Sequence, residues 1–497
     1  MPRPFIRKVQ TASGATAVQI VQKQGSDIVS LEHIGSAHTQ TELALLIAAD
    51  KDKLFEMQPA LDLFPGIDSD VFMQKAYSEL LYKVLESQYD ALGFSALADK
   101  TFKQLVLARI IEPASKTDTI RILDNLGLKA PSNTGIHRCL RRIINEDYRS
   151  SVSAICFKHA DAGSLSLVLY DVTTLYFEAQ KEDGYRISGM SKERRLEPQI
   201  TVGLLVGRDG FPLEIASFEG NKAEVKTIME VLGAFKSRYG LSEMTVTADA
   251  AMLSSQNVSE LEEAGYHYII GSRIAKTPYE IEEYAKAPGS ELKDGQIFDL
   301  TIAMNTGKGQ TRIERRVIYQ YRADRARLDL LNIDKLLAKA QRMVAGTSEF
   351  KRNRFLKVSG SKKEINNELV EKSRLKAGIK GYVTDLDVPA QEVIDAYHQL
   401  FQVERSFRMA KSDLRARPIF HHVRDSIEAH LTVVFVALAI SRHIQAKTGL
   451  SIRLFKHILE PLRTGILSVN GAQQRYRPQL NKAARDILLS LGIDRIW

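Results

Sequence analysis

Three acidic residues lie in contexts that would bring them together at one edge of a folded sheet. Asp171 ends the apolar stretch Leu165–Asp171, and Asp249 ends Met244–Asp249, so both follow patterns typical of strands. Glu404 lies in a helical pattern, 155 residues after Asp249, and an apolar helical stretch follows it in the sequence. Acids at strand ends project from one edge of a sheet, and a helix that crosses this edge adds a third.

Carboxylate oxygens that leave coordination positions open are suited to Mg²⁺ or Mn²⁺. Two such ions, about 3.5–4 Å apart, activate a water or a 3′-hydroxyl and stabilise the departing oxygen at phosphorus. We therefore predict that Asp171, Asp249 and Glu404 are catalytic residues that hold two divalent ions. Each Asp taken alone is more often a cap or turn residue, but the order of all three acids makes coincidence a poor explanation.

The helical stretch around Glu404 also carries a series of cations. At 100° per residue, Tyr397, Glu404, Arg408, Lys411 and Arg415 fall on one face of a helix. The alternative is a solvated i,i+4 ion pair between Glu404 and Arg408, which stabilises a helix by about 0.2–0.5 kcal/mol. The two acids in strand contexts favour the catalytic interpretation.

Charge is distributed unevenly along the 497 residues, whose net charge is +9. Residues 1–150 carry 18 basic and 18 acidic side chains, whereas residues 405–497 carry 16 and 6. The basic excess therefore lies behind Glu404, which indicates a polyanionic partner, most often nucleic acid. The alternative is that this charge serves solubility alone.

Composition excludes several classes of protein. With 44% hydrophobic and 26% charged residues the chain is typical of a soluble globular protein. No apolar run of about 18 residues and no secretion signal are present, so we predict no membrane span and a cytoplasmic, nucleoid-associated protein. The two cysteines, Cys139 and Cys156, exclude a disulfide scaffold and a cysteine-rich zinc site.

The order of patterns predicts an α/β fold. Residues 1–35 alternate as strand–turn–strand, and residues 40–148 are mostly helical, with helices expected through Leu43, from Asp70 to Leu85 and from Lys103 to Ile111. Residues 117–148 resemble two helices around a short turn, and Arg138, Arg141 and Arg142 make them a candidate DNA reader. Strands then surround both Asp residues, hairpin strands are expected within 272–380, and an apolar helix is expected over 427–444.

These residues and their spacing resemble the DDE transposases of bacterial insertion sequences, in the subgroup with a Tyr-x2-Arg-x3-Glu-x6-Lys signature. Tyr397, Glu404 and Lys411 match the signature, and Asp171 in Tyr-Asp-Val-Thr-Thr and Asp249 in Ala-Asp-Ala-Ala match the two Asp motifs. The resemblance covers roughly residues 160–445. It implies an RNase H-like mixed-sheet catalytic domain with a β-rich insertion, preceded by a mostly helical N-terminal region.

The resemblance also implies a function. The expected enzyme is a cut-and-paste transposase that binds the terminal inverted repeats of its element, cleaves the DNA and joins the 3′ ends to target DNA. Double-stranded DNA is the expected partner, with self-association on DNA. The residues expected to bind DNA are Tyr397, Arg405, Arg408, Lys411 and Arg415. Of these, Tyr397, Arg408 and Lys411 are expected to hold phosphates near the scissile bond. A metal-dependent nuclease without strand joining, and a non-catalytic DNA-binding protein on a transposase scaffold, are the alternatives.

Two departures from the family pattern are visible. Leu400 stands where the signature has Arg, and we expect Arg408 to supply the missing positive charge while Leu400 packs beneath the helix. Some relatives stack a flipped base on a Trp of the insertion, but the single Trp of this chain is Trp497. Tyr319 or Tyr321 could replace that Trp, and whether hairpinned DNA ends form is left open.

The expected domain boundaries follow from these patterns. They are an N-terminal β-hairpin region over 1–40, a helical and candidate DNA-binding region over 41–160, a catalytic domain over 161–271 and 381–445, a β-rich insertion over 272–380, and a basic C-terminal region over 446–497.

Overall fold

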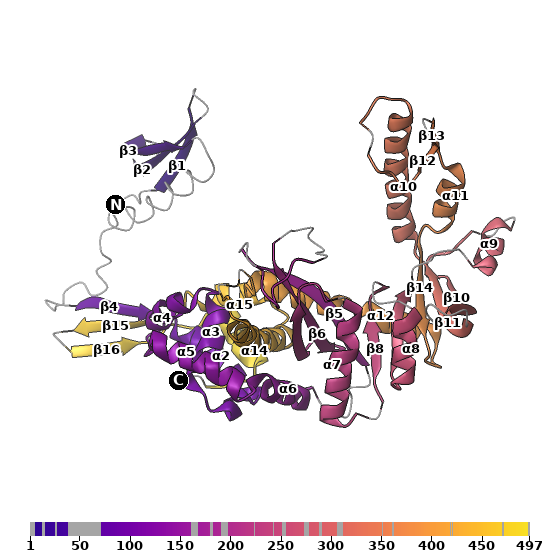
Figure 1. Cartoon of the computed structure of the whole chain (residues 1–497). Coiled ribbons are helices and arrows are strands. Elements are labelled where there is room, and N and C mark those ends of the chain that lie inside the picture. Colours follow the sequence, from indigo (N-terminus) through magenta and orange to yellow (C-terminus); the bar gives the residue numbers. More distant parts are fainter. Residues whose placement is uncertain are drawn as a thin grey trace. The chain divides into compact units, whose positions relative to one another are not determined.

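The fold is described from a computed structural model of the whole chain (Figure 1). The described residues are 5–11, 15–24, 27–37, 71–160, 167–178, 182–189, 197–222, 224–241, 243–250, 255–272, 278–287, 291–305, 312–349, 351–359, 362–417, 419, 421–469 and 472–495. The chain forms two compact units, residues 1–72 with 468–473, and residues 73–467 with 474–497.

The first unit contains a three-stranded antiparallel sheet in the order β1-β2-β3. Its strands are β1 (Phe5–Gln10), β2 (Thr16–Gln24) and β3 (Asp27–Ala37). The alternation seen in the sequence is therefore confirmed as strand structure, with one more strand than expected. The helix expected through Leu43 lies outside the described residues.

An eight-stranded mixed sheet organises the second unit, in the order β10-β11-β14-β9-β8-β5-β6-β7. Five of its strands have the topology of an RNase H-like sheet. They are β5 (Leu167–Tyr176), β6 (Gln199–Gly207), β7 (Pro212–Glu219), β8 (Thr245–Ala248) and β9 (His267–Ser272). The first three are antiparallel neighbours, whereas β8 and β9 run parallel to β5. The mixed α/β fold predicted from the sequence is thus confirmed.

The remaining strands of this sheet come from the segment that follows β9. They are β10 (Ile297–Asn305), β11 (Arg312–Tyr321) and β14 (Ile379–Thr384), and β14 pairs antiparallel with β9. The expected hairpin strands of the insertion are therefore present, and they extend the central sheet. Outside that sheet the segment contains α9 (Tyr279–Lys286), α10 (Ala323–Val344), α11 (Asn367–Leu375), β12 (Leu356–Ser359) and β13 (Lys362–Ile365).

Helices cover the sheet and build the region before it. The front helices are α2 (Glu79–Ala91), α3 (Lys100–Ile111), α4 (Lys116–Asn125), α5 (Asn133–Asn145) and α6 (Tyr148–His159). The helices between strands are α7 (Glu224–Tyr239) and α8 (Ser255–Glu263). After β14 come α12 (Ala390–His398), α13 (Phe401–Arg408), a π-helical turn at Met409–Asp413 and α14 (Arg424–Thr448).

The long apolar helix α14 is the centre of the core. It packs against β7 and against α2, α3, α5 and α6, so the helical front region and the catalytic sheet share one compact unit (Figure 1). Its most apolar window has a mean hydropathy of 1.4, enough to cross a membrane by composition, yet 89% of that window is buried inside the protein. Its hydrophobic length is thus explained by packing on all sides.

The chain ends in α15 (Ile452–Leu459), β15 (Thr464–Val469), β16 (Ala472–Tyr476) and α16 (Lys482–Ser490). A small sheet in the order β16-β15-β4 includes β4 (Val71–Tyr77). The sequence had predicted a helix from Asp70 through Ala76, and this part of the prediction was wrong. Pairing with β15 supplies the strand's hydrogen bonds, a long-range contact that overrides the local helical pattern.

Candidate active site

The alternation of β5 decides which way the first acid faces. Tyr170 points to α7, where its hydroxyl hydrogen-bonds Thr227 Oγ1 at 2.9 Å. Successive side chains of a strand face opposite sides, so Asp171 faces the other side, together with Thr173 and Leu175. That side is packed against Phe407 of α13 and against α14. Asp171 therefore lies on the face that the helix of Glu404 covers.

The register of the parallel strands aligns the two aspartates. Leu169 of β5 is the partner of Thr247 of β8. Asp171 lies two residues beyond Leu169 inside β5, which continues to Tyr176, so the expectation that Asp171 ends its strand was wrong. Asp249 lies two residues beyond Thr247, one residue past the end of β8. Neighbouring strands lie about 4.8 Å apart, so the two aspartates stand on neighbouring segments of the chain.

Glu404 is carried to the same face by α13, which packs on β5 and β6. Val403 and Phe407 are buried beneath the helix, whereas Glu404 and Arg408 are exposed. Within the described part of the chain, neither side chain has a hydrogen bond or an ion pair. The i,i+4 ion pair that was the alternative interpretation of these two residues is therefore not formed.

Tyr397 contacts the second acid. It is buried at the end of α12, its ring lies 4.8 Å from that of Tyr382, and its hydroxyl lies 3.4 Å from Asp249 Oδ1. Burial, with the Asp249 carboxylate adding to it, raises the pKa of Tyr397. Gly271 permits this approach, because a Cβ there would lie only 2.5 Å from the hydroxyl. Tyr397 thus holds the Asp249 side chain, while its expected contact with DNA stays a prediction.

Lys380 is a functional candidate that sequence analysis missed. Its ammonium, on β14, lies 4.3 Å from the centre of the Tyr397 ring. Burial and Arg325 lower the pKa of Lys380, while the Asp249 and Glu404 carboxylates oppose that shift, so this cation lies within electrostatic reach of both acids. In the sequence, the one feature that distinguishes Lys380 is its position in an otherwise apolar strand, Ile379–Thr384.

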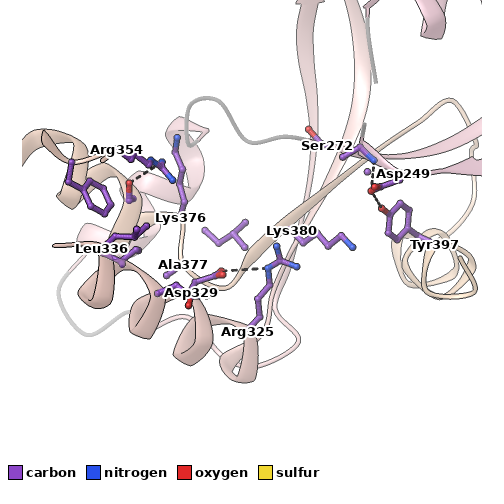
Figure 2. A pocket seen from close by; sticks show the side chains of 17 residues that line it. Asp249, Ser272, Arg325, Asp329, Leu336, Arg354, Lys376, Ala377, Lys380 and Tyr397 are labelled. Atoms are coloured by element: carbon purple, nitrogen blue, oxygen red, sulfur yellow. Dashed lines mark hydrogen bonds and ion pairs between the residues drawn. The ribbon is translucent and has the colours of Figure 1, made fainter. Parts of the chain in front are cut away.

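A pocket of about 520 Å³ opens beside Asp249 (Figure 2). Asp249 and Tyr397 line one side of it, and residues from α10, α11 and the loops next to them line the other. Its cations are Arg325, Arg354, Lys376 and Lys380. Arg325 forms an ion pair with Asp329 at 3.6 Å and Arg354 donates to Ser373 Oγ at 3.2 Å. The insertion therefore brings positive charge to the edge of the sheet that holds the acids.

The remaining residues expected to contact DNA follow Glu404 along the chain. Arg405 and Arg415 are exposed and Lys411 is half-buried in the π-helical turn. Leu400 is buried, as expected. The helix is tightened there by hydrogen bonds three residues apart, from Leu400 N–H to Tyr397 O and from Val403 N–H to Leu400 O. Because this tightened turn changes the helical spacing, Tyr397 is buried while Glu404 and Arg408 are exposed. The expectation that these side chains share one face of a single helix was therefore wrong.

The candidate DNA-reading helices of the front region are present as α4 and α5. Their N-caps are Ser115 and Ser132. Arg142 is held by the buried Asp99 through its Nε at 2.8 Å, and Tyr148 shares the same carboxylate at 3.1 Å. Arg142 is therefore a structural residue, whereas Arg138 and Arg141 of the same helix are exposed.

The Asp249 carboxylate has capacity for a further ligand such as a divalent cation. Asp249 accepts hydrogen bonds from Tyr397 and from the Ala250 N–H at 2.6 Å, which leaves lone pairs on the carboxylate for further ligands. Adjacent like charges repel, and a divalent cation would offset that repulsion. Across the described ranges, no three His, Cys, Asp or Glu side chains form a ready-made metal cluster.

Comparisons with known proteins identify the family of the chain. The family model of the transposase DDE domain matches residues 162–440, more than half of the chain. No curated protein matches the chain. A solved structure of a piggyBac transposase synaptic complex with hairpin DNA is similar at 9% sequence identity, with a TM-score of 0.38, over 77% of this chain and 79% of that one.

The chain therefore belongs to the DDE transposase family. It is a DDE-type enzyme, a DNA transposase, and this family uses divalent metal ions. The recognition made from the two Asp motifs and Glu404 is confirmed at the level of the family.

Proposed function

We propose that this transposase acts by the cut-and-paste route of bacterial insertion sequences. It binds terminal inverted repeats, cleaves the DNA and joins the 3′ ends to target DNA, and it self-associates on the DNA. Asp171, Asp249 and Glu404 hold two Mg²⁺ or Mn²⁺ ions as catalytic ligands. The observation that carries this proposal is the parallel pairing of Leu169 with Thr247, each two residues before one of the aspartates, together with the packing of the Glu404 helix on β5.

Each group at the site has a separate task in this proposal. The bound ions would supply charge stabilisation at phosphorus and an activated oxygen nucleophile. The Tyr397 hydroxyl orients the Asp249 carboxylate, and Lys380 adds a fixed positive charge beside Asp249 and Glu404. Arg408, exposed one turn after Glu404, has a planar guanidinium suited to holding a phosphate bidentately. The subgroup's Arg is replaced by the buried Leu400, which supports this role for Arg408.

The experiment that tests the proposal follows the products of the wild-type chain. Purified protein is incubated with a duplex that ends in the inverted repeat flanking its gene, together with a supercoiled target plasmid, with Mg²⁺ or with EDTA. We expect 3′-end cleavage and covalent joining to the plasmid with Mg²⁺, and neither with EDTA. Cleavage without joining would identify a nuclease, and binding without cleavage would identify a DNA-binding protein on this scaffold.

Replacing Arg408 with Ala should weaken cleavage roughly 10- to 100-fold, the equivalent of about 1.5–3 kcal/mol for a hydrogen bond to a charged group. The reason is the loss of a phosphate ligand beside the scissile bond. The measurement is the single-turnover cleavage rate, with Arg485→Ala as the control, because Arg485 is an equally exposed arginine on α16. Equal rates for Arg408→Ala and the wild type would leave Arg408 as a surface residue without a role.

A further inference from the structure

A second cationic pocket, of about 590 Å³, lies where the front helices meet the chain beyond Glu404. Its positive lining comes from three separate segments. Arg109 lies near the end of α3, Arg415 follows the π-helical turn, and Lys456 lies on α15. We call it the Arg109 pocket.

Two acids, Glu112 and Asp118, also line the pocket, and neither is paired with its cations. Glu112 forms an ion pair with Arg121 at 2.6 Å, and Asp118 accepts a hydrogen bond from Ser115 Oγ at 2.7 Å. Arg109 itself, in the part of the chain that the structure describes, has no hydrogen bond or ion pair. Burial lowers its pKa to about 10. The pocket therefore contains a guanidinium whose donors have no partner among the described residues.

Two more basic side chains, Lys116 and His421, lie near Arg109, and the charge of Arg109 disfavours their protonation. Lys116 contacts the ring of His421, and burial followed by repulsion from Arg109 lowers the pKa of Lys116 to about 7. Burial and repulsion from Lys116 and Arg109 lower the pKa of His421 to about 4. Grouping cations in a desolvated place costs free energy unless an anion completes the group. The Lys456 ammonium is fixed at the pocket by donating to Ile111 O at 2.9 Å.

We propose that the Arg109 pocket binds a phosphate of the DNA backbone at a point away from the cleaved bond. This inference rests on the proposed function. The guanidiniums of Arg109 and Arg415 and the ammonium of Lys456 are the ligands, and the N-terminal end of α4, which begins after Ser115 at the same pocket, favours an anion there.

Continuity with the catalytic sheet favours DNA as the source of this phosphate. Arg415 also lines a neighbouring pocket of about 380 Å³ together with Lys411, Arg417 and Tyr176. Tyr176 is the last residue of β5, the strand that carries Asp171. One cationic surface therefore leads from the catalytic strand to α3. A backbone that follows it would fix the register of the duplex without reading its bases.

The first measurement is the salt dependence of DNA binding by the full chain. Arg109→Gln should weaken binding of the inverted-repeat duplex about tenfold and lower the log–log salt slope by about 0.9, the value for one lost phosphate contact. Arg415→Asn should act in the same way, and Asn tolerates the positive φ of 44° that Arg415 adopts. Arg485→Gln, on α16, is the matched control and should change neither quantity.

The second measurement uses inorganic phosphate and does not depend on DNA activity. Sodium phosphate should raise the melting temperature of the wild type more than sodium chloride does at equal ionic strength. In Arg109→Gln the two salts should give the same melting temperature. Without phosphate, Arg109→Gln should melt no lower than the wild type, because the substitution removes a charge that has no partner.

The outcomes separate this inference from the proposed function. If the wild type neither binds nor cleaves the duplex, the proposed function fails, and the backbone phosphate fails with it. If the wild type binds and cleaves but Arg109→Gln leaves the salt slope unchanged, the inference is overturned. Loss of the phosphate effect with an unchanged slope would make the pocket a site for free phosphate. A lower melting temperature with an unchanged slope would make Arg109 a structural residue.

Discussion

Glu404→Gln is expected to reduce DNA cleavage about a thousandfold or more while DNA binding stays nearly unchanged. Gln keeps the shape of the side chain and removes the negative charge that would hold a divalent ion. A loss of about 4 kcal/mol of transition-state stabilisation corresponds to a factor of roughly a thousand. Because Glu404 is exposed and has no partner among the described residues, folding should not depend on it.

The measurement is the single-turnover cleavage rate with Mg²⁺, together with the dissociation constant for the inverted-repeat duplex. Glu392→Gln is the matched control, since Glu392 is an exposed acid in the first turn of α12 and, like Glu404, follows β14 in the sequence. The control should cleave like the wild type. Cleavage by Glu404→Gln at a near wild-type rate would show that Glu404 is not the third acid of the site.

Phe435→Ala is expected to destabilise the second unit by about 3–5 kcal/mol, the usual cost of truncating a buried aromatic side chain. Phe435 is fully buried in α14, the helix on which the sheet and the front helices both pack. Its removal leaves a cavity that rigid strands and helices fill only in part.

Urea unfolding followed by circular dichroism measures this effect as a lower midpoint with the same slope. Leu489→Ala is the control, because Leu489 on α16 is 69% exposed and should cost less than about 0.5 kcal/mol. A cost below about 1 kcal/mol for Phe435→Ala would be inconsistent with α14 as the core helix of this unit.

The positions of the three acids were predictable from sequence because each stands at a recognisable place in a local pattern. Asp171 and Asp249 end runs of apolar residues that are typical of buried strands, and Glu404 has the helical spacing of its neighbours. Local alternation also predicted the N-terminal strands and the hairpin strands of the insertion. Such patterns are reliable because the spacing of apolar residues depends only on which side of a single helix or strand is buried.

Contacts between distant segments could not be predicted in the same way. Residues 71–77 have an apolar spacing compatible with a helix, yet they form a strand because β15, almost 400 residues later, supplies its hydrogen bonds. Tyr397 appeared to share an exposed face with Glu404, but the tightened turn at Leu400 buries it against Tyr382 and Asp249. Lys380 and Arg109 could not be recognised from the sequence as candidate functional residues. A single basic residue in an apolar stretch does not by itself indicate a binding site.

The sequence by itself was enough to identify the family of this protein, because the types and order of Asp171, Asp249 and Glu404 match the motifs of the DDE transposases. Only the tertiary structure decided how these residues are supported. The register of β5 with β8, the lysine near Asp249 and Glu404, and the cations gathered from α3, α15 and the chain after Glu404 all arise from long-range contacts. Residues far apart in the chain carry no mutual signal until packing against one sheet and one buried helix brings them together.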